Sequence, residues 1–186
     1  MNKYYSKLNI DFYPLAENFN LFNQTQSQKV FDIQNNSLDK FLNLNLLDWL
    51  NYLRITIQHI ECFYRRPYNK GLIHSDVNGG DFTKINYIFG GKNSYMQWYE
   101  PLAHSKGLDQ RTPSGNTPYV AFAEKDVIPV SKACLTGYNL VQVGIPHTII
   151  NDSEERFCLS IVISDINKKR ITMQQAQSVL KDYIIE

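Results

Sequence analysis

The spacing of hydrophobic residues along the chain changes at Arg54. Across residues 38–53 the apolar positions recur at three- and four-residue steps, which is typical of a helix that buries one face. Asn36 or Ser37 can cap the start of this helix, and Asn45 hints at a restart. The segment therefore predicts either one helix or two short ones.

Beyond Arg54 the pattern becomes that of strands. Apolar and polar residues alternate across residues 55–64, so the two sides of this strand differ in character. Shorter runs, separated by turn residues, continue to Ser164. The segments predicted as strands are 55–64, 72–74, 82–89, 94–99, 127–135, 140–150 and 157–164. Residues 101–118 contain three prolines and two glycines and are expected to form an exposed loop, either a lid over a site or an idle insertion.

A last helix is predicted near the C-terminus, because Thr172 followed by Gln175 forms a capping-box pattern. The apolar positions of this helix are Met173, Ala176, Val179, Leu180 and Ile184. Strands and helices do not alternate between residues 55 and 164, which excludes a doubly wound parallel sheet. The pattern favours a mainly β fold, an antiparallel sandwich or jelly roll, with the N-terminal helices and the C-terminal helix packed on one outer sheet face.

The length of 186 residues suits one domain with a sizeable core. We expect a single domain over residues 1–186, in which 1–54 give helical support, 55–165 form the β core and 166–186 form the C-terminal helix. With 19 Lys+Arg against 18 Asp+Glu the formal net charge is +1. Such a chain has no general electrostatic attraction to nucleic acid or to an anionic membrane.

Compartment and partners follow from what the sequence lacks. No apolar run approaches the roughly 18 residues of a membrane span, and the N-terminus has no apolar signal core. Three cysteines without a CxxC pair argue against a disulfide framework and exclude a zinc ribbon. We expect a cytoplasmic protein with a small-molecule or peptide side-chain substrate and no nucleic-acid or membrane partner. The oligomeric state stays open.

Metal-binding chemistry is indicated by three residues. His74 and Asp76 form an H-x-D pattern at the end of a predicted strand, where residues i and i+2 point the same way. His147 follows 73 residues later on another predicted strand. Two imidazoles and one carboxylate make up the facial triad that binds Fe(II) and leaves positions open for substrates and O2.

Two cations are expected near this triad. Alternation in the last strand puts Arg156 on a mixed face and leaves the other face apolar. The mixed face is Arg156, Cys158, Ser160 and Val162, and the apolar face is Phe157, Leu159, Ile161 and Ile163. Lys84 and Asn86 share the more polar side of the strand over 82–89. A hairpin is expected to bring Arg156 close to His147, and two converging cations would suit a dicarboxylate co-substrate.

These residues lie in four ordered blocks, 73–76, 84–86, 93–100 and 144–156. The blocks resemble the Fe(II)/2-oxoglutarate-dependent dioxygenases, and most closely their aspartyl/asparaginyl β-hydroxylase-like branch with its phage and bacterial relatives. The resemblance covers about residues 55–165 and implies a double-stranded β-helix, or jelly roll. It places His74, Asp76 and His147 at the iron-ligand positions and Arg156 where a basic residue grips the far carboxylate of 2-oxoglutarate. The residues that fall near the co-substrate are Lys84 and Asn86.

The activity implied by the resemblance is hydroxylation of an unactivated C–H bond, with O2 consumed and 2-oxoglutarate converted to succinate and CO2. Two departures leave the subfamily and the substrate open. Several members of this branch lack the acidic ligand, whereas Asp76 is present here, and Lys84 stands where arginine is expected. Two alternatives stay open as well. One is a cupin-like metal enzyme that does not use 2-oxoglutarate, and the other is a non-catalytic jelly-roll binding module.

Overall fold

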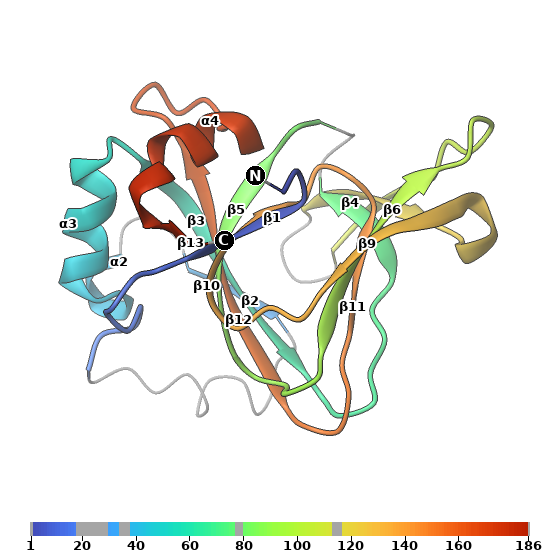
Figure 1. The fold of residues 1–186 in the computed structure, drawn as a ribbon, viewed down its shortest axis with the longest axis horizontal. Helices are drawn as coiled ribbons and strands as arrows, with labels where there is room; N and C mark the ends of the chain where they lie inside the picture. Colours follow the sequence, from blue (N-terminus) through green and yellow to red (C-terminus); the bar gives the residue numbers. More distant parts are fainter. Residues whose placement is uncertain (1, 18–29, 34–37, 77–79, 113–116, 186) are drawn as a thin grey trace.

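The computed structural model describes residues 2–17, 30–33, 38–76, 80–112 and 117–185. It consists of two antiparallel sheets with short helices on the outside of one of them (Figure 1). The seven-stranded sheet has the order β13 (Ile184–Ile185), β1 (Tyr5–Leu8), β10 (Gly137–Gln142), β5 (Thr83–Gly90), β12 (Arg156–Ser164), β3 (Thr56–Arg65) and β2 (Val30–Ile33). The six-stranded sheet has the order β7 (Leu108–Arg111), β8 (Pro118–Phe122), β4 (Ile73–Asp76), β11 (His147–Ile150), β6 (Tyr95–Pro101) and β9 (Val127–Ala133). The expected mainly β class with antiparallel sheets is confirmed.

One hydrophobic layer lies between the seven-stranded sheet and the helices α3 (Leu44–Tyr52) and α4 (Met173–Val179). The apolar face predicted for the last strand belongs to this layer, because all four of its residues are at most 3% exposed and cluster with residues of the helices. Leu46 and Leu50 of α3 and Ala176 of α4 are almost fully buried there. The prediction that helices cover one outer sheet face is therefore confirmed.

A second hydrophobic layer joins the two sheets. Trp98 of β6 is fully buried and shares a cluster with Ile88 and Cys158 of the seven-stranded sheet. Its indole ring stacks on Tyr5, with ring centroids 5.7 Å apart, and its Nε1 donates a hydrogen bond of 2.9 Å to the carbonyl of Gln142. Trp98 therefore acts as a spacer between the sheets, and its neighbour on β11 is His147.

The helices follow the sequence pattern closely. Residues 38–53 form two helices, α2 (Leu38–Phe41) and α3, and Asn43 caps the second through its side chain. The proposed caps Asn36 and Ser37 lie outside the described residues. Helix α4 has the predicted capping box between Thr172 and Gln175. Of its predicted apolar positions, Met173, Ala176 and Leu180 are buried, Val179 is 41% exposed, and Ile184 belongs to β13.

The predicted boundaries were wrong in two places. Residues 1–54 are not only helical, since β1 and β2 add strands to the seven-stranded sheet. Residues 101–118 are not only loop, because they include β7 and the start of β8. Each of these strands is only four or five residues long, and β1, β2 and β8 pair with distant segments, so local periodicity gives little sign of them.

The predicted strand over 140–150 is in fact two strands in different sheets. It breaks between β10 and β11, where Gly144 passes so close to Gly80 that a Cβ on Gly144 would lie 1.6 Å from the Gly80 carbonyl oxygen. The connection from β11 to β12 likewise crosses between the sheets, so the expected hairpin joining His147 to Arg156 is wrong. The two residues sit on opposite walls of the sandwich.

No helix within the described part of the chain is long and apolar enough to cross a membrane.

Candidate metal centre

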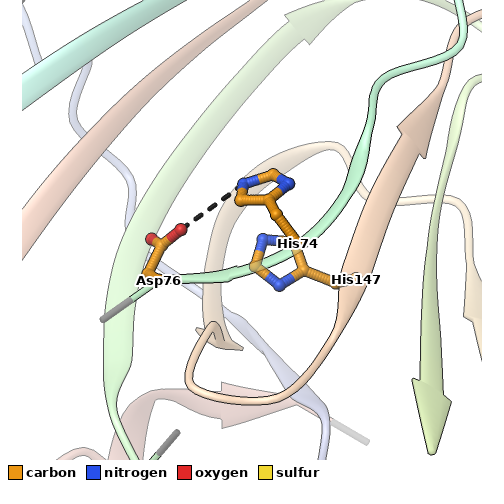
Figure 2. Close-up of side chains that lie close together, drawn as sticks. All are labelled: His74, Asp76 and His147. Carbon is orange, nitrogen blue, oxygen red and sulfur yellow. Dashed lines mark ion pairs between the residues drawn. The ribbon is translucent and has the colours of Figure 1, made fainter. Parts of the chain in front are cut away.

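His74, Asp76 and His147 come together on adjacent strands of the six-stranded sheet. His74 and His147 are directly paired in the register of β4 and β11, and Asp76 follows two residues after His74 on the same face. One ligand atom from each residue lies within 4.8 Å of the others. Figure 2 shows the three side chains grouped together, with Asp76 Oδ1 and His74 Nε2 3.4 Å apart. Among the described residues, this is the group that could hold a metal ion.

Both imidazoles are oriented by their own backbone. Nδ1 of His74 lies 3.0 Å from the carbonyl of Leu72, and Nδ1 of His147 lies 2.9 Å from the carbonyl of Ile145. Because a carbonyl can only accept, each Nδ1 must carry the hydrogen of these bonds. A neutral imidazole then has its lone pair on Nε2, which is the arrangement that orients histidine as a metal ligand. The donor set fits a divalent first-row metal ion.

Electrostatics favour the protonation states that a metal needs. Burial of His147, with His74 beside it, lowers its pKa to about 4, so the ring is neutral at pH 7. Burial alone would raise the pKa of Asp76, but the nearby Lys84, helped by His74 and His147, outweighs it and holds this pKa well below its usual range. His147 therefore offers a neutral imidazole and Asp76 a carboxylate, so neither has to lose a proton before it binds a metal.

Lys84 lies next to the triad, but its ammonium group is already engaged. Its Nζ is 2.6 Å from Asp76 Oδ2 and also pairs with Glu61 Oε2. Asn86, two residues further along β5, accepts a 2.7 Å hydrogen bond from the hydroxyl of Ser160. Both residues predicted to lie near a co-substrate thus face the interior, and both have protein partners.

Glu61 is a charged neighbour of the site that was not predicted from the sequence. Its side chain is only 9% exposed, and His59 Nε2 approaches its other oxygen, Oε1, at 3.7 Å. The alternation in β3 already put His59 and Glu61 on one face. What alternation does not show is which face of a strand turns toward the other sheet.

Arg156 is 3% exposed and lies on the inward, mixed face of β12. Arg65 of β3 is directly opposite it in the sheet register, and directly opposed residues share a face. Neither guanidinium has a carboxylate within 4.0 Å among the described residues, and the side-chain bond of Arg65 goes to the amide oxygen of Asn69. Burial lowers the pKa of both arginines, which remain cations. Sequence reasoning predicted Arg156 but not Arg65.

The two predicted cations do not converge at one point. Lys84 pairs in register with Val162, and six residues of β12 separate that position from Arg156. At the rise of a strand this is about 20 Å between backbones. Lys84 therefore stands at the Asp76 end of the interior and Arg156 toward the other end.

The loop before His147 is held by a small polar network. Gln142 Oε1 accepts a 2.9 Å hydrogen bond from the backbone N–H of Gly144, and the Gln142 amide nitrogen donates to Asp81. Asp81 also accepts from the backbone N–H of Met173 at the start of α4. The Ile145 carbonyl in this loop orients the His147 ring. A network that fixes the loop therefore also helps to fix the orientation of His147.

A separate cavity of about 800 Å³ opens on the other face of the six-stranded sheet. Ser75, which alternates with His74 and Asp76 along β4, lines this cavity, whereas no triad residue does. Lys106 and Asp109, from the segment expected to be an exposed loop, also line it. This segment therefore borders a cavity that the triad does not share.

Comparison with known proteins gives distant structural likeness only. No family model and no curated protein matches the chain. Among solved structures it is similar to peruvianin-I, a cysteine peptidase from Thevetia peruviana latex, with 13% identity, a TM-score of 0.32, and coverage of 90% of this chain and 94% of that chain. It is also similar to oxalate oxidase in complex with the substrate analogue glycolate, with 12% identity, a TM-score of 0.33, and coverage of 90% and 77%.

Proposed function

We propose that the protein is an Fe(II)- and 2-oxoglutarate-dependent oxygenase that hydroxylates its substrate. The observation that carries this proposal is the meeting of one nitrogen from each of two imidazoles and one carboxylate oxygen within 4.8 Å, on a wall that faces the sandwich interior. Two imidazoles and one carboxylate leave open positions on an octahedral ferrous ion, as oxygenase chemistry requires. The family resemblance of residues 55–165 agrees with this donor set.

The strand order supports a double-stranded β-helix. Eight strands form the centre of the sandwich, namely β3, β4, β5, β6, β9, β10, β11 and β12. Counted in chain order, the sixth, third, eighth and first are neighbours in one sheet, and the second, seventh, fourth and fifth are neighbours in the other. This is the order produced when a long antiparallel hairpin winds into a jelly roll.

The proposed roles follow from position. His74, Asp76 and His147 hold the ferrous ion, which supplies the activation of O2 for decarboxylation of the keto acid and oxidation of a C–H bond. Arg156 binds the far carboxylate of 2-oxoglutarate by a charge-assisted pair in a desolvated setting, and Arg65 opposite it adds a second guanidinium. Both arginines are free of carboxylate partners in the described part of the chain, as an anion site requires.

A metal enzyme that does not use 2-oxoglutarate is the second candidate. The observation in its favour is that Lys84 is already paired with Asp76 and Glu61, so it is not the free cation beside the triad that a dicarboxylate would call for. On this reading the arginines at the far end bind a different anion. A cytoplasmic location and a small-molecule or peptide side-chain substrate stay predictions under both candidates.

Anaerobic binding of Fe(II) and 2-oxoglutarate separates the two candidates. The oxygenase should develop the weak visible charge-transfer band of a keto acid bound to ferrous iron, and on exposure to O2 it should release succinate. His74→Ala should abolish both signals, whereas the exposed His104 gives a matched control, His104→Ala, that should retain them. Tight Fe(II) binding with neither band nor succinate would contradict 2-oxoglutarate use and favour the second candidate.

A further inference from the structure

A chain of ionisable groups leads from the surface of the protein to Asp76. It begins at His59, whose side chain is 26% exposed and approaches Glu61. Glu61 pairs with Lys84, and Lys84 pairs with Asp76. The three inner groups come from β3, β5 and β4, so the chain crosses from one sheet to the other. Lys84 is the link between the two walls.

The two oxygens of Asp76 have different partners. Oδ1 faces His74 Nε2 at 3.4 Å, on the side where the triad atoms converge, whereas Oδ2 lies 2.6 Å from Lys84 Nζ. An ion bound among the triad atoms can therefore use Oδ1 while Oδ2 stays with the ammonium group. Lys84 thus favours a carboxylate that binds through one oxygen in a fixed orientation.

Charge explains why Glu61 is needed. Lys84 alone, only 6% exposed, would cancel the negative charge of Asp76 and repel a divalent cation. Glu61 adds a second negative charge, so the two carboxylates and the ammonium group together have a net charge of −1. The Coulomb interaction is strong because the groups are shielded from water.

We infer that Lys84 and Glu61 are positioning residues of the metal centre. Lys84 holds the oxygen of Asp76 that does not bind the metal, and Glu61 neutralises Lys84 so that Asp76 keeps its attraction for the ion. The inference rests on the metal centre of the proposed function but not on 2-oxoglutarate. It assigns Lys84 to the metal ligand rather than to the co-substrate.

Titration with Co(II) alone, followed by its visible absorption, tests this assignment. Glu61→Gln keeps the shape and an oxygen acceptor but leaves Lys84 uncompensated, so Co(II) affinity should fall about tenfold, the lower end of what partners of metal ligands contribute. Glu124→Gln removes one carboxylate from an exposed pair with Lys70 and should change the affinity by less than about twofold. Unchanged affinity in Glu61→Gln would overturn the inference.

The same substitution in a Lys84→Met background shows whether Glu61 acts through Lys84. There Glu61→Gln should change Co(II) affinity by less than about twofold, because the charge it compensated is gone. An equal tenfold loss in both backgrounds would overturn the inference. If Glu61→Gln alone does not fold, the double variant, which has no uncompensated ammonium group, is compared with Lys84→Met: equal affinity supports the coupling, and a further loss contradicts it.

Measurements of 2-oxoglutarate binding separate a role of Lys84 in the metal centre from a role in co-substrate binding. If Lys84→Met kept the wild-type Co(II) affinity and only raised the 2-oxoglutarate concentration needed for half-saturation, Lys84 would be a co-substrate ligand and the inference would fall. A wild-type chain that binds Co(II) but not 2-oxoglutarate would contradict the oxygenase proposal and leave the inference standing. A wild-type chain that takes up no Co(II) would contradict the metal centre and this inference together.

Discussion

The two ends of the sandwich interior treat buried charge in opposite ways. At the triad end, Lys84 contacts both Asp76 and Glu61, so each of these ionic groups has an opposite charge beside it. At the other end, Arg65 and Arg156 are like charges directly opposite each other on neighbouring strands. No carboxylate lies within 4.0 Å of either arginine in the described residues.

The difference bears on what each end binds. Like charges directly opposite in a sheet destabilise it, and an unpaired buried charge costs several kcal/mol. A bound anion would lower this cost by supplying the missing charge. The triad end, with a net negative charge, suits a cation, and the arginine end suits an anion.

The largest effect is expected from breaking the triad end. Asp76→Ala removes one of three ligands and the only anionic one, and it leaves Lys84 next to the ion. Since loss of a partner of a metal ligand already costs roughly 10- to 100-fold, loss of the ligand itself should weaken Co(II) binding by more than about 100-fold. Isothermal titration of the variant and of the His104→Ala control measures this. Near-wild-type affinity in Asp76→Ala would place the metal elsewhere.

Substitution of either arginine should weaken binding of the proposed co-substrate and leave the metal affinity unchanged. Arg156→Met keeps much of the buried volume but removes a charge-assisted pair of about 2–3 kcal/mol. The 2-oxoglutarate concentration for half-maximal succinate release should rise roughly 30- to 150-fold, with Co(II) affinity unchanged. Arg65→Met should give a smaller rise of about tenfold. An Arg156 variant with unchanged 2-oxoglutarate affinity would end the co-substrate assignment.

Acid should weaken the triad end and spare the arginine end. The folded state lowers the pKa of His147 to about 4, against the usual 6.5, so between these pH values the unfolded chain binds more protons. The free energy of unfolding of the metal-free protein should therefore decrease as pH falls from about 6.5 to about 4, by up to about 3 kcal/mol from this residue. Guanidinium groups do not titrate in this range.

Urea unfolding at several pH values measures this contribution. His147→Gln should show a shallower loss of stability than the wild type over the same pH window, because the titrating group is gone. Parallel curves for the two proteins would show that His147 is not held neutral by burial.

A substitution in the loop before His147 should disturb the triad less than the loss of a ligand does. Gly144→Ala would place a methyl group against the Gly80 carbonyl and should cost about 1–3 kcal/mol of stability while displacing the ring of His147. Gly137→Ala is the control, since its Cβ meets nothing within 4 Å, although its φ of 62° carries a cost of about 1 kcal/mol. Co(II) affinity should fall in the first variant and not in the second. Equal affinities would show that the loop adapts without moving the ligand.

The smallest effect is expected away from both ends. Thr172→Ala removes the capping box of α4 and should lower the free energy of unfolding by about 1 kcal/mol in urea titrations. Metal and 2-oxoglutarate affinities should not change, so this variant shows how much general destabilisation contributes to the others. A clear loss of Co(II) affinity would mean that α4 supports the site through Asp81.

Much of the fold could be predicted from the sequence wherever a local pattern of residues has a single structural explanation. The alternation in residues 157–163 separated the face under the helices from the inward face, because one side is uniformly apolar and the other is not. The capping box at Thr172 is a local motif and was read correctly. The triad residues could be named because the chain has only four histidines, because Asp76 follows His74 at i+2, and because both histidines lie on predicted strands.

What could not be predicted depends on contacts between distant segments. The run over 140–150 is mostly apolar, since both of its strands are largely buried, and only Gly144 and Pro146 hint at the break. Glu61 and Arg65 sit on a strand whose inner face carries charge, and the cations next to them, Lys84 and Arg156, come from other strands. Alternation shows that such residues share a side, but not that this side turns inward.

The passage of the chain from β11 to β12 across the sandwich has a mechanical consequence. The triad lies on the six-stranded sheet and the two arginines lie on the seven-stranded sheet. The distance between them therefore depends on the separation of the two sheets rather than on the geometry of one turn. Trp98, wedged beside Tyr5, sets that thickness next to His147. If the arginines bind one carboxylate of a co-substrate, as proposed, a smaller residue in place of Trp98 should change the length of diacid that the protein prefers, although it changes none of the proposed metal ligands.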